Sequence, residues 1–329
     1  MPGDNENIIL EVKDLKMWFP VRKGLLSKPE YVKAVNNVSF SIKKGETLAL
    51  VGESGSGKTT LGKTVLRLYE PSEGSIIFDG KDISHLTEKE LRWFRKRAQM
   101  IYQDPYESLN PYYKVYDILD EVLISNGITD KEERSERILS VLDRVGLTPP
   151  SEYIKKYPHM LSGGQRQRVA IARAIILNPD FIVADEPVSM LDASIRAQIL
   201  YLLREFRESY GITLLYITHD LATTKYFSDR IAVMYAGRLI EVGKTREILG
   251  NPFHPYTQAL IEAVPDPDPQ NRLKLRGTPP GEPPNLINPP PGCPFNPRCP
   301  KKLDICEKEV PELIEVSPGR KVACHLYRT

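Results

Sequence analysis

The chain has 329 residues, 41% of them hydrophobic, which is enough for one large domain or one domain with an appendage. Its net charge of +2 gives no strong field toward nucleic acid or an anionic membrane, so we expect no nucleic-acid partner. No run approaches the roughly 20 apolar residues of a membrane span, and the start, Met1–Asp4, lacks the basic and apolar parts of a signal peptide. We therefore expect a cytosolic protein that reaches a membrane only through a partner.

In chain order, the first 45 residues contain two apolar runs, Ile8–Leu15 and Val32–Phe40, which predict an antiparallel β flap. Strands are then predicted at Thr47–Val51, Ala98–Tyr102, Phe181–Asp185 and Thr213–Thr218, and helices at Lys58–Tyr69, Gly163–Leu177 and Ser194–Tyr210. Strands that alternate with helices favour a parallel sheet covered by helices. Residues 105–160 show helical periodicity without a convincing strand, as in Tyr116–Val122 and Glu133–Val145, and are predicted to form a helical insert.

The composition changes near residue 264. Prolines become dense there, at Pro265–Pro269, Pro279-Pro280, Pro283-Pro284 and Pro289–Pro291. Consecutive prolines lack amide donors and fix φ, so this stretch is predicted to be neither helix nor central strand. We interpret residues 1–263 as a globular body and residues 264–329 as a separate tail.

The run from Gly52 to Thr59, GESGSGKT, fits the pattern G-x-x-x-x-G-K-[ST] between a predicted strand and a predicted helix, which is the context this motif requires. Its glycines let backbone N–H groups point at phosphate oxygens, and the helix start favours anions. Lys58 is expected to reach the β and γ phosphates and Thr59 to bind Mg²⁺. The alternative is a glycine-rich β–α turn without a ligand. The nucleotide ligands predicted here are Gly52, Ser54, Gly55, Ser56, Gly57, Lys58, Thr59 and Thr60.

The run Phe181–Glu186 is an apolar strand that ends in two carboxylates. Asp185 is expected to hold Mg²⁺, and Glu186 to accept a proton from the attacking water. A solvated strand end could carry the same pair for no chemical reason, but the phosphate motif upstream favours the functional interpretation. The two motifs together predict a nucleoside triphosphatase.

Between these motifs, Leu161-Ser-Gly-Gly-Gln165 opens another predicted helix and resembles the signature sequence of ATP-binding-cassette (ABC) ATPases. A hydroxyl at Ser162 and two glycines, Gly163 and Gly164, at a helix start suit a phosphate. If the first two motifs already hold one nucleotide, this second phosphate-binding helix start needs another. The resemblance implies that the second nucleotide lies on a facing subunit, so that two chains pack head-to-tail around two ATP molecules.

Further ABC motifs follow in the family's order. Gln103 resembles the glutamine loop that contacts Mg²⁺ and the attacking water, and His219 resembles the switch histidine on the γ-phosphate. Ser189–Asp192 resembles the D-loop, with Met190 in place of the usual alanine. By the same resemblance, Gln165 and Asp192 join the predicted nucleotide contacts.

Phe19, with Trp18 as the alternative, stands where the family places an aromatic side chain on adenine, although packing within the flap would explain it equally. The resemblance covers residues 8–263 and implies an α/β fold. This fold is a P-loop NTPase, RecA-like core with an antiparallel β flap, an inserted α-helical subdomain at about 105–160, and a small proline-rich, cysteine-containing C-terminal tail.

Finer features resemble the second of the two ATPase subunits of oligopeptide/dipeptide importers. They are the runs Tyr102–Pro111, Tyr157–His159, Ala184–Ser189 and Asn251–Leu260. This resemblance implies a heterodimer with a second ABC ATPase, two integral-membrane permease subunits and an extracytoplasmic solute-binding protein, at the cytoplasmic face of the cell membrane. Nickel and oligosaccharide importers share the architecture, and a non-transport ABC ATPase is a further alternative.

All four cysteines lie in the last 37 residues, spaced C-x5-C-x6-C-x17-C: Cys293, Cys299, Cys306 and Cys324. In a reducing cytosol such a group favours a metal site over disulfides. The C-x2-C knuckles of zinc ribbons are missing, and four thiolates can hold a [4Fe–4S] cluster as readily as Zn²⁺. The importer family's tail resembles a cysteine-ligated iron–sulfur module, with Zn²⁺ or no metal as alternatives and His325 as a possible substitute ligand. A metal would staple a tail too small to bury much core.

Overall fold

The computed structural model describes residues 7–21, 29–264 and 281–328. It divides into two compact units. Unit 1 comprises Met1–Ile42, Thr47–His85 and Ile217–Thr329, and unit 2 comprises Lys43–Glu46 and Leu86–Tyr216. In the part of the chain that is described, no helix has the length and apolar character that a bilayer crossing requires.

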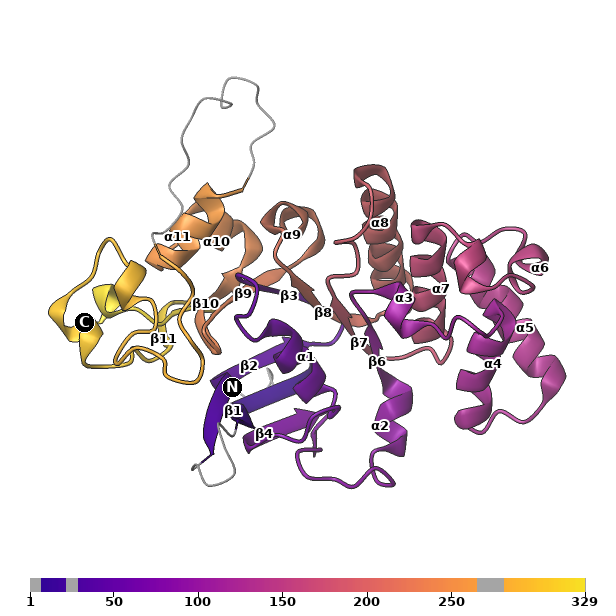
Figure 1. Cartoon of the computed structure of the whole chain (residues 1–329), viewed down its shortest axis with the longest axis horizontal. Helices are drawn as coiled ribbons and strands as arrows, with labels where there is room; N and C mark the ends of the chain where they lie inside the picture. The colour runs from indigo at the N-terminus through magenta and orange to yellow at the C-terminus, as the bar shows by residue number, and fades with distance from the viewer. Residues whose placement is uncertain (1–6, 22–28, 265–280, 329) are drawn as a thin grey trace, which may run out of the picture. The chain divides into compact units, whose positions relative to one another are not determined.

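Unit 1 contains the predicted flap as a four-stranded sheet in the order β2-β1-β4-β5 (Figure 1). Its strands are β1 (Ile8–Val21), β2 (Glu30–Lys43), β4 (Glu73–Phe78) and β5 (Lys81–Asp82). β1 and β4 run antiparallel with Leu10 opposite Phe78, and the register shifts between Lys13 and Lys16. The buried side of the sheet is apolar and includes Ile9, Leu10 and Phe78. The flap is therefore confirmed, with strands longer than predicted.

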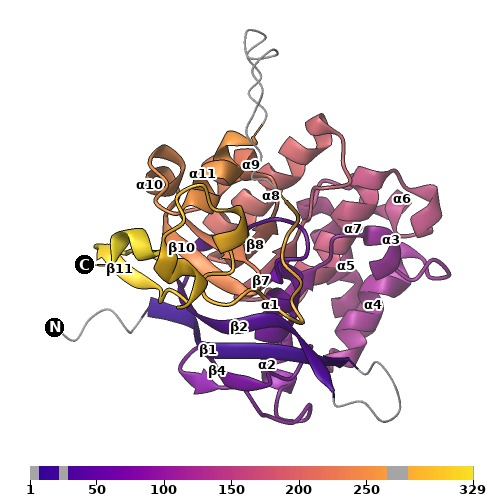
Figure 2. The same ribbon diagram turned by 60° about the vertical axis from the view of Figure 1, so that its left-hand side comes forward.

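The second sheet of unit 1 has the order β11-β12-β10-β9-β3, and its C-terminal strands belong to the predicted tail (Figure 2). Its strands are β3 (Thr47–Val51), β9 (Arg230–Tyr235), β10 (Arg238–Lys244), β11 (Ile314–Ser317) and β12 (Arg320–Val322). β3 and β9 are parallel, whereas the pairs β9–β10, β10–β12 and β11–β12 are antiparallel. The helices of this unit are α1 (Lys58–Val65), α9 (Leu221–Phe227), α10 (Thr245–Gly250) and α11 (Pro255–Glu262).

Unit 2 contains the parallel pair β6 (Ala98–Ile101) and β7 (Phe181–Asp185), with Ala98 opposite Phe181. β8 (Thr213–Thr218) begins in this unit. Residues 105–160, all of which the structure describes, form helices and no strand, as predicted. The helices of the unit, several of them clustered in Figure 1, are α2 (Arg92–Arg97), α3 (Pro105–Ser108), α4 (Val115–Ser125), α5 (Lys131–Arg144), α6 (Pro150–Tyr153), α7 (Gly163–Ile175) and α8 (Ala193–Tyr210).

Three predicted strands have the predicted bounds, and the fourth, β6, ends one residue early. The helix predicted to reach Tyr69 ends instead at Val65, because Arg67 adopts a positive φ of 55° and turns inward to donate from Nε to the Ile83 carbonyl (2.8 Å). The prolines at 265–269 and 279–280 lie outside the described residues. The division into residues 1–263 and 264–329 stays a prediction, since residues 281–328 belong to unit 1.

Candidate functional site

The loop between β3 and α1 is shaped by two glycines that no other residue could replace without moving the backbone. Gly52 has φ 154°, and a Cβ there would lie 2.2 Å from the Met234 carbonyl oxygen. Gly57, the N-cap of α1, has φ 102°, and its Cβ would lie 2.0 Å from the Ala34 carbonyl oxygen. The loop is thus packed against neighbouring backbone, and a side chain at either glycine would displace it.

Lys58 lies inside this loop rather than on its surface. Its side chain is buried, and Nζ donates to the carbonyl oxygens of Gly52 and Glu53, each at 2.8 Å. The amide of Ser56 donates to the Glu53 carbonyl (3.2 Å), while Ser54 and Gly55 form the exposed crest. Thr59 and Thr60 follow in the first turn of α1 and are half-buried. The loop therefore presents the predicted ammonium and hydroxyl groups around one curled stretch of backbone.

In unit 2, the parallel pairing of β6 with β7 brings two predicted residues together at the strand ends. Gln103, just after β6, donates from Nε2 to Oε2 of Glu186 at 3.1 Å. Asp185 is buried at the end of β7, and Glu186 follows it with a positive φ of 44°. An unusual backbone angle on a residue that is not glycine is often found at functional sites, where it aims a side chain.

The signature residues lie at the start of α7, also in unit 2. Ser162 is the N-cap: its hydroxyl accepts from the Gln165 amide (3.3 Å), and the Gln165 side chain accepts from the Ser162 amide (3.0 Å). This reciprocal capping box fixes the helix start. A Cβ on Gly164 would lie 2.7 Å from Cγ2 of Ile195 in α8, so that glycine also serves packing. Asp192 precedes α8 as its N-cap residue.

His219 and Phe19 both belong to unit 1. His219 is exposed at the end of β8, and the next residue, Asp220, caps α9 by accepting from the Ala222 amide (2.9 Å). Phe19 is half-buried and meets Tyr69 edge-on, with ring centroids 5.4 Å apart. The alternative aromatic residue, Trp18, has two lysine ammonium groups near its ring, those of Lys16 and Lys33, each 5.3 Å from the ring centroid.

Comparison with known proteins identifies the family to which this chain belongs. The ABC transporter family matches residues 35–189, and the family described as "Oligopeptide/dipeptide transporter, C-terminal region" matches residues 240–306. The oligopeptide transport ATP-binding protein AppF of Bacillus subtilis is 48% identical over 99% of this chain and 100% of its own length. The chain belongs to the ABC transporter ATP-binding proteins.

Two further relatives of this ABC ATPase agree with that placement. The dipeptide transport ATP-binding protein DppF of Haemophilus influenzae is 45% identical over 96% of each chain. A solved ATP-binding cassette, dimeric in a post-hydrolysis state bound to ADP and Pi, is 31% identical with a TM-score of 0.64, covering 72% of this chain and 99% of its own. The P-loop NTPase fold predicted from the motifs is therefore confirmed.

The four cysteines of the ABC ATPase approach one another in the C-terminal segment. The Cys293 amide donates to the Cys306 carbonyl (2.8 Å), and burial together with the neighbouring thiols raises the pKa of Cys293 to about 12. Burial also raises the pKa values of Cys299 and Cys324. Among the described residues, however, no three histidine, cysteine or acidic side chains are arranged to hold a metal ion. The predicted iron–sulfur or zinc site is therefore not confirmed.

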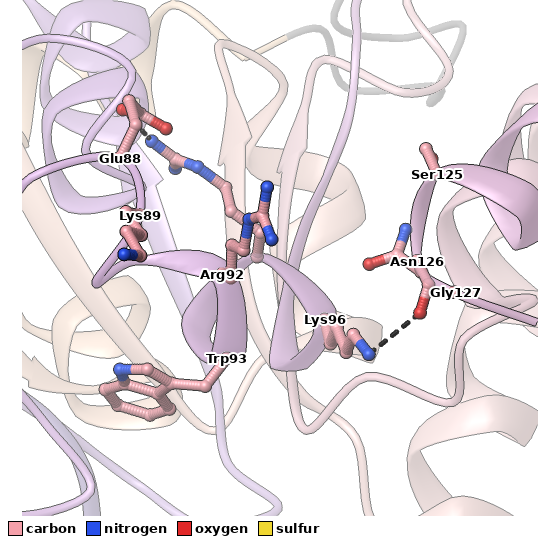
Figure 3. Close-up of a pocket in the computed structure, with 9 residues that line it drawn as sticks. Glu88, Lys89, Arg92, Trp93, Lys96, Ser125, Asn126 and Gly127 are labelled. Carbon is pink, nitrogen blue, oxygen red and sulfur yellow. Dashed lines mark hydrogen bonds and ion pairs between the residues drawn. The ribbon is translucent and has the colours of Figure 1, made fainter.

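A cavity of about 940 Å³ lies beside α2 in unit 2 (Figure 3). Three exposed side chains on its wall are cationic or polar, Lys89, Arg92 and Lys96, and the Lys96 ammonium donates to the Asn126 carbonyl at 2.9 Å. Trp93 lines the same cavity. No motif in the sequence pointed to this cavity, because its residues come from two separate stretches of the chain, 88–96 and 125–127.

Sequence reasoning also missed the residues that hold the phosphate loop from behind. The Glu53 amide donates to the Tyr256 hydroxyl (2.8 Å), and the Glu53 carboxylate pairs with Arg298. Burial raises the pKa of Tyr256, so its hydroxyl keeps its proton at neutral pH. The available signal was Phe295 and Arg298 between Cys293 and Cys299, which local patterns do not connect to the loop.

Proposed function

We propose that this ABC ATPase binds and hydrolyses ATP to drive the import of peptides through a membrane transporter. The observation that carries the proposal is the loop Gly52–Thr59, whose backbone is fixed by glycines at positions where no Cβ fits and whose lysine lies inside the curl. Relatives named for oligopeptide and dipeptide transport, similar over nearly the full chain, support peptides as the cargo. Nickel and oligosaccharides are the alternative solutes, and a non-transport ATPase is the alternative function.

Each site residue has a role in this proposal. Lys58 and the loop amides bind the β and γ phosphates, and Phe19 contacts the adenine. Thr59, Gln103 and Asp185 would hold Mg²⁺, which neutralises phosphate charge when bound. Glu186 takes the proton from the attacking water, Gln103 orients Glu186 through the 3.1 Å contact, and His219 contacts the γ-phosphate.

The signature residues serve the nucleotide of a facing subunit. The capped start of α7 presents backbone amides at Gly163 and Gly164, which suit the phosphates of an ATP held by the partner's loop. The proposed partner is a different ABC ATPase, so that the assembly is a heterodimer packed head-to-tail. Closure of that dimer on ATP moves the helical subdomains, and hydrolysis reopens it.

The cavity beside α2 is the proposed contact with the permeases. Its exposed Lys89, Arg92 and Lys96 suit a cytoplasmic permease segment that offers carboxylates or helix C-terminal carbonyls. The protein would thereby lie at the cytoplasmic face of the cell membrane, with an extracytoplasmic solute-binding protein on the other side. Arg92→Glu should weaken co-purification of the permeases while leaving the ATP affinity of the isolated chain unchanged.

Reconstitution tests the function. The chain, its partner ATPase and two permeases in proteoliposomes, with the solute-binding protein supplied on its own side, should take up labelled peptide only with ATP and Mg²⁺. The matched control replaces this chain by Lys58→Ala. Uptake of nickel or an oligosaccharide instead of peptide would reassign the cargo, and association with ribosomes or DNA without permeases would support the non-transport alternative.

We infer further that the four cysteines bind a [4Fe–4S] cluster, with Zn²⁺ as the alternative. The support is the gathering of Cys293, Cys299, Cys306 and Cys324, since, besides burial, the other three cysteines help to raise the pKa of Cys293. Cysteine sulfurs are the donors that iron–sulfur clusters use. Anaerobically purified protein should contain iron and absorb near ~400 nm; zinc alone, or neither metal, would refute the cluster.

A further inference from the structure

The phosphate loop contains a carboxylate of its own, and this is an electrostatic problem. Glu53 lies between Gly52 and the crest residue Ser54, and its side chain is 27% exposed. Its carbonyl oxygen accepts from both Lys58 Nζ (2.8 Å) and the Ser56 amide (3.2 Å), so Glu53 is part of the curl itself. A negative side chain within a loop that binds a polyanion opposes binding unless it is neutralised.

Arg298 neutralises it from the C-terminal segment. Its guanidinium forms a two-pronged pair with Glu53, Nη1 to Oε2 at 2.9 Å and Nη2 to Oε1 at 3.2 Å, and its side chain is only 7% exposed. Nη1 also donates to the Tyr235 hydroxyl at 3.3 Å. An arginine guanidinium is charged at neutral pH, and in this position it has the Glu53 carboxylate and the Tyr235 hydroxyl as hydrogen-bond partners. Paired, bidentate contacts of this kind are strong and geometrically specific.

The guanidinium is itself held in place by buried packing. Arg298 ends a short 3-10 turn, Asn296–Arg298, in which the Asn296 side-chain amide donates to the carbonyls of Pro291 and Cys293 (2.9 Å each). The buried ring of Phe295 packs edge-on against Tyr235 at 5.3 Å. The same ring contacts Tyr256, whose hydroxyl accepts from the Glu53 amide. Arg298, through its hydrogen bond to Tyr235, and Tyr256 therefore both connect one aromatic cluster to the same loop residue, Glu53.

We propose that Arg298 is a positioning residue for the ATPase site: it cancels the charge of Glu53 and fixes the loop, so that the C-terminal segment completes the phosphate site. The inference rests on the proposed ATP binding at this loop. Without Arg298, the Glu53 carboxylate remains on the loop without its counter-charge and opposes the incoming phosphates.

The test measures ATP affinity of the full chain with Mg²⁺ by calorimetric titration. Arg298→Met should weaken ATP binding about tenfold, which corresponds to ~1.4 kcal/mol. Adding Glu53→Gln in the Arg298→Met background should return the affinity to within about threefold of the unmodified chain, because the opposing charge is gone. Arg298→Lys keeps the charge but loses the bidentate contact with Glu53, so its ATP affinity should lie between those of the unmodified chain and Arg298→Met. If Arg298→Met does not fold, the ATP affinities of the double variant and of Arg298→Lys still test the positioning role.

The matched control is Arg320→Met, which breaks another buried arginine–carboxylate pair of the same C-terminal segment, Arg320 with Glu241, that does not touch the loop. It should lower the melting temperature and leave ATP affinity unchanged. Equal loss of affinity in both variants, or no rescue by Glu53→Gln, would overturn the positioning role. If the unmodified chain does not bind ATP, the proposed function itself is wrong.

Discussion

The pair between Arg320 and Glu241 gives a stability prediction that can be worked out from its surroundings. Arg320, in β12, donates from Nη2 to Oε1 of Glu241 in β10 at 2.9 Å, and their side chains are 5% and 0% exposed. The guanidinium also lies 3.5 Å from the centre of the Phe253 ring. The methionine of Arg320→Met would still cover the Phe253 ring, but the buried Glu241 carboxylate would lose its positively charged partner.

Loss of one partner of a buried pair typically costs ~3–5 kcal/mol. The cost here should lie near the lower limit, ~3 kcal/mol, because Glu241 keeps two donors, the amides of Phe253 (2.9 Å) and His254 (3.0 Å). An unfolding entropy of ~2.1 cal/mol/K per residue gives ~0.7 kcal/mol/K for a chain of 329 residues. The melting temperature should therefore fall by ~4 °C.

Scanning calorimetry of the purified chain measures this shift. Adding Glu241→Gln to Arg320→Met removes the stranded charge and should recover at least half of the loss. A melting temperature unchanged by Arg320→Met, or a double variant no more stable than the single one, would refute the reasoning that the unpaired carboxylate carries the cost.

Three further predictions concern the catalytic base, acid stability and the loop glycines. Glu186→Gln should retain ATP binding while phosphate release falls by ~10²–10⁴, and normal turnover would refute the base assignment. Burial lowers the pKa of His254 to about 3, so only the unfolded chain takes up its proton between pH 6.5 and 3. Stability should thus fall by ~1.4 kcal/mol by pH 5.5, a loss that calorimetry should find missing in His254→Asn. Gly57→Ala should abolish ATP binding in a titration, whereas Gly55→Ala, also at positive φ but with nothing within 4 Å of the new Cβ, should retain most of it.

The features that the sequence predicted well are local in the chain. The phosphate loop is a run of eight residues whose glycines, lysine and threonine each have a chemical reason, and β3 and β7 are short, mainly apolar runs. The meeting of Gln103 with Glu186 was also predictable, since both follow neighbouring parallel strands, β6 and β7.

The features that were missed depend on contacts between distant segments. Glu53 and Arg298 are 245 positions apart, and no period or motif relates them. The early end of α1 depends on Arg67 finding the Ile83 carbonyl, a tertiary contact that overrides helix propensity. Gly164 was predicted from its chemistry toward phosphate, but its contact with Ile195 shows that helix packing also demands a small residue there.

The long separation of Glu53 and Arg298 has a consequence for biosynthesis. The ribosome makes Glu53 245 positions before Arg298, so a nascent chain that has already made every nucleotide motif still carries an uncompensated carboxylate in the loop. Messages cut short before residue 298 would encode proteins with these motifs but weaker affinity for ATP. Tight binding of the nucleotide would thus begin only after the ribosome has made Arg298.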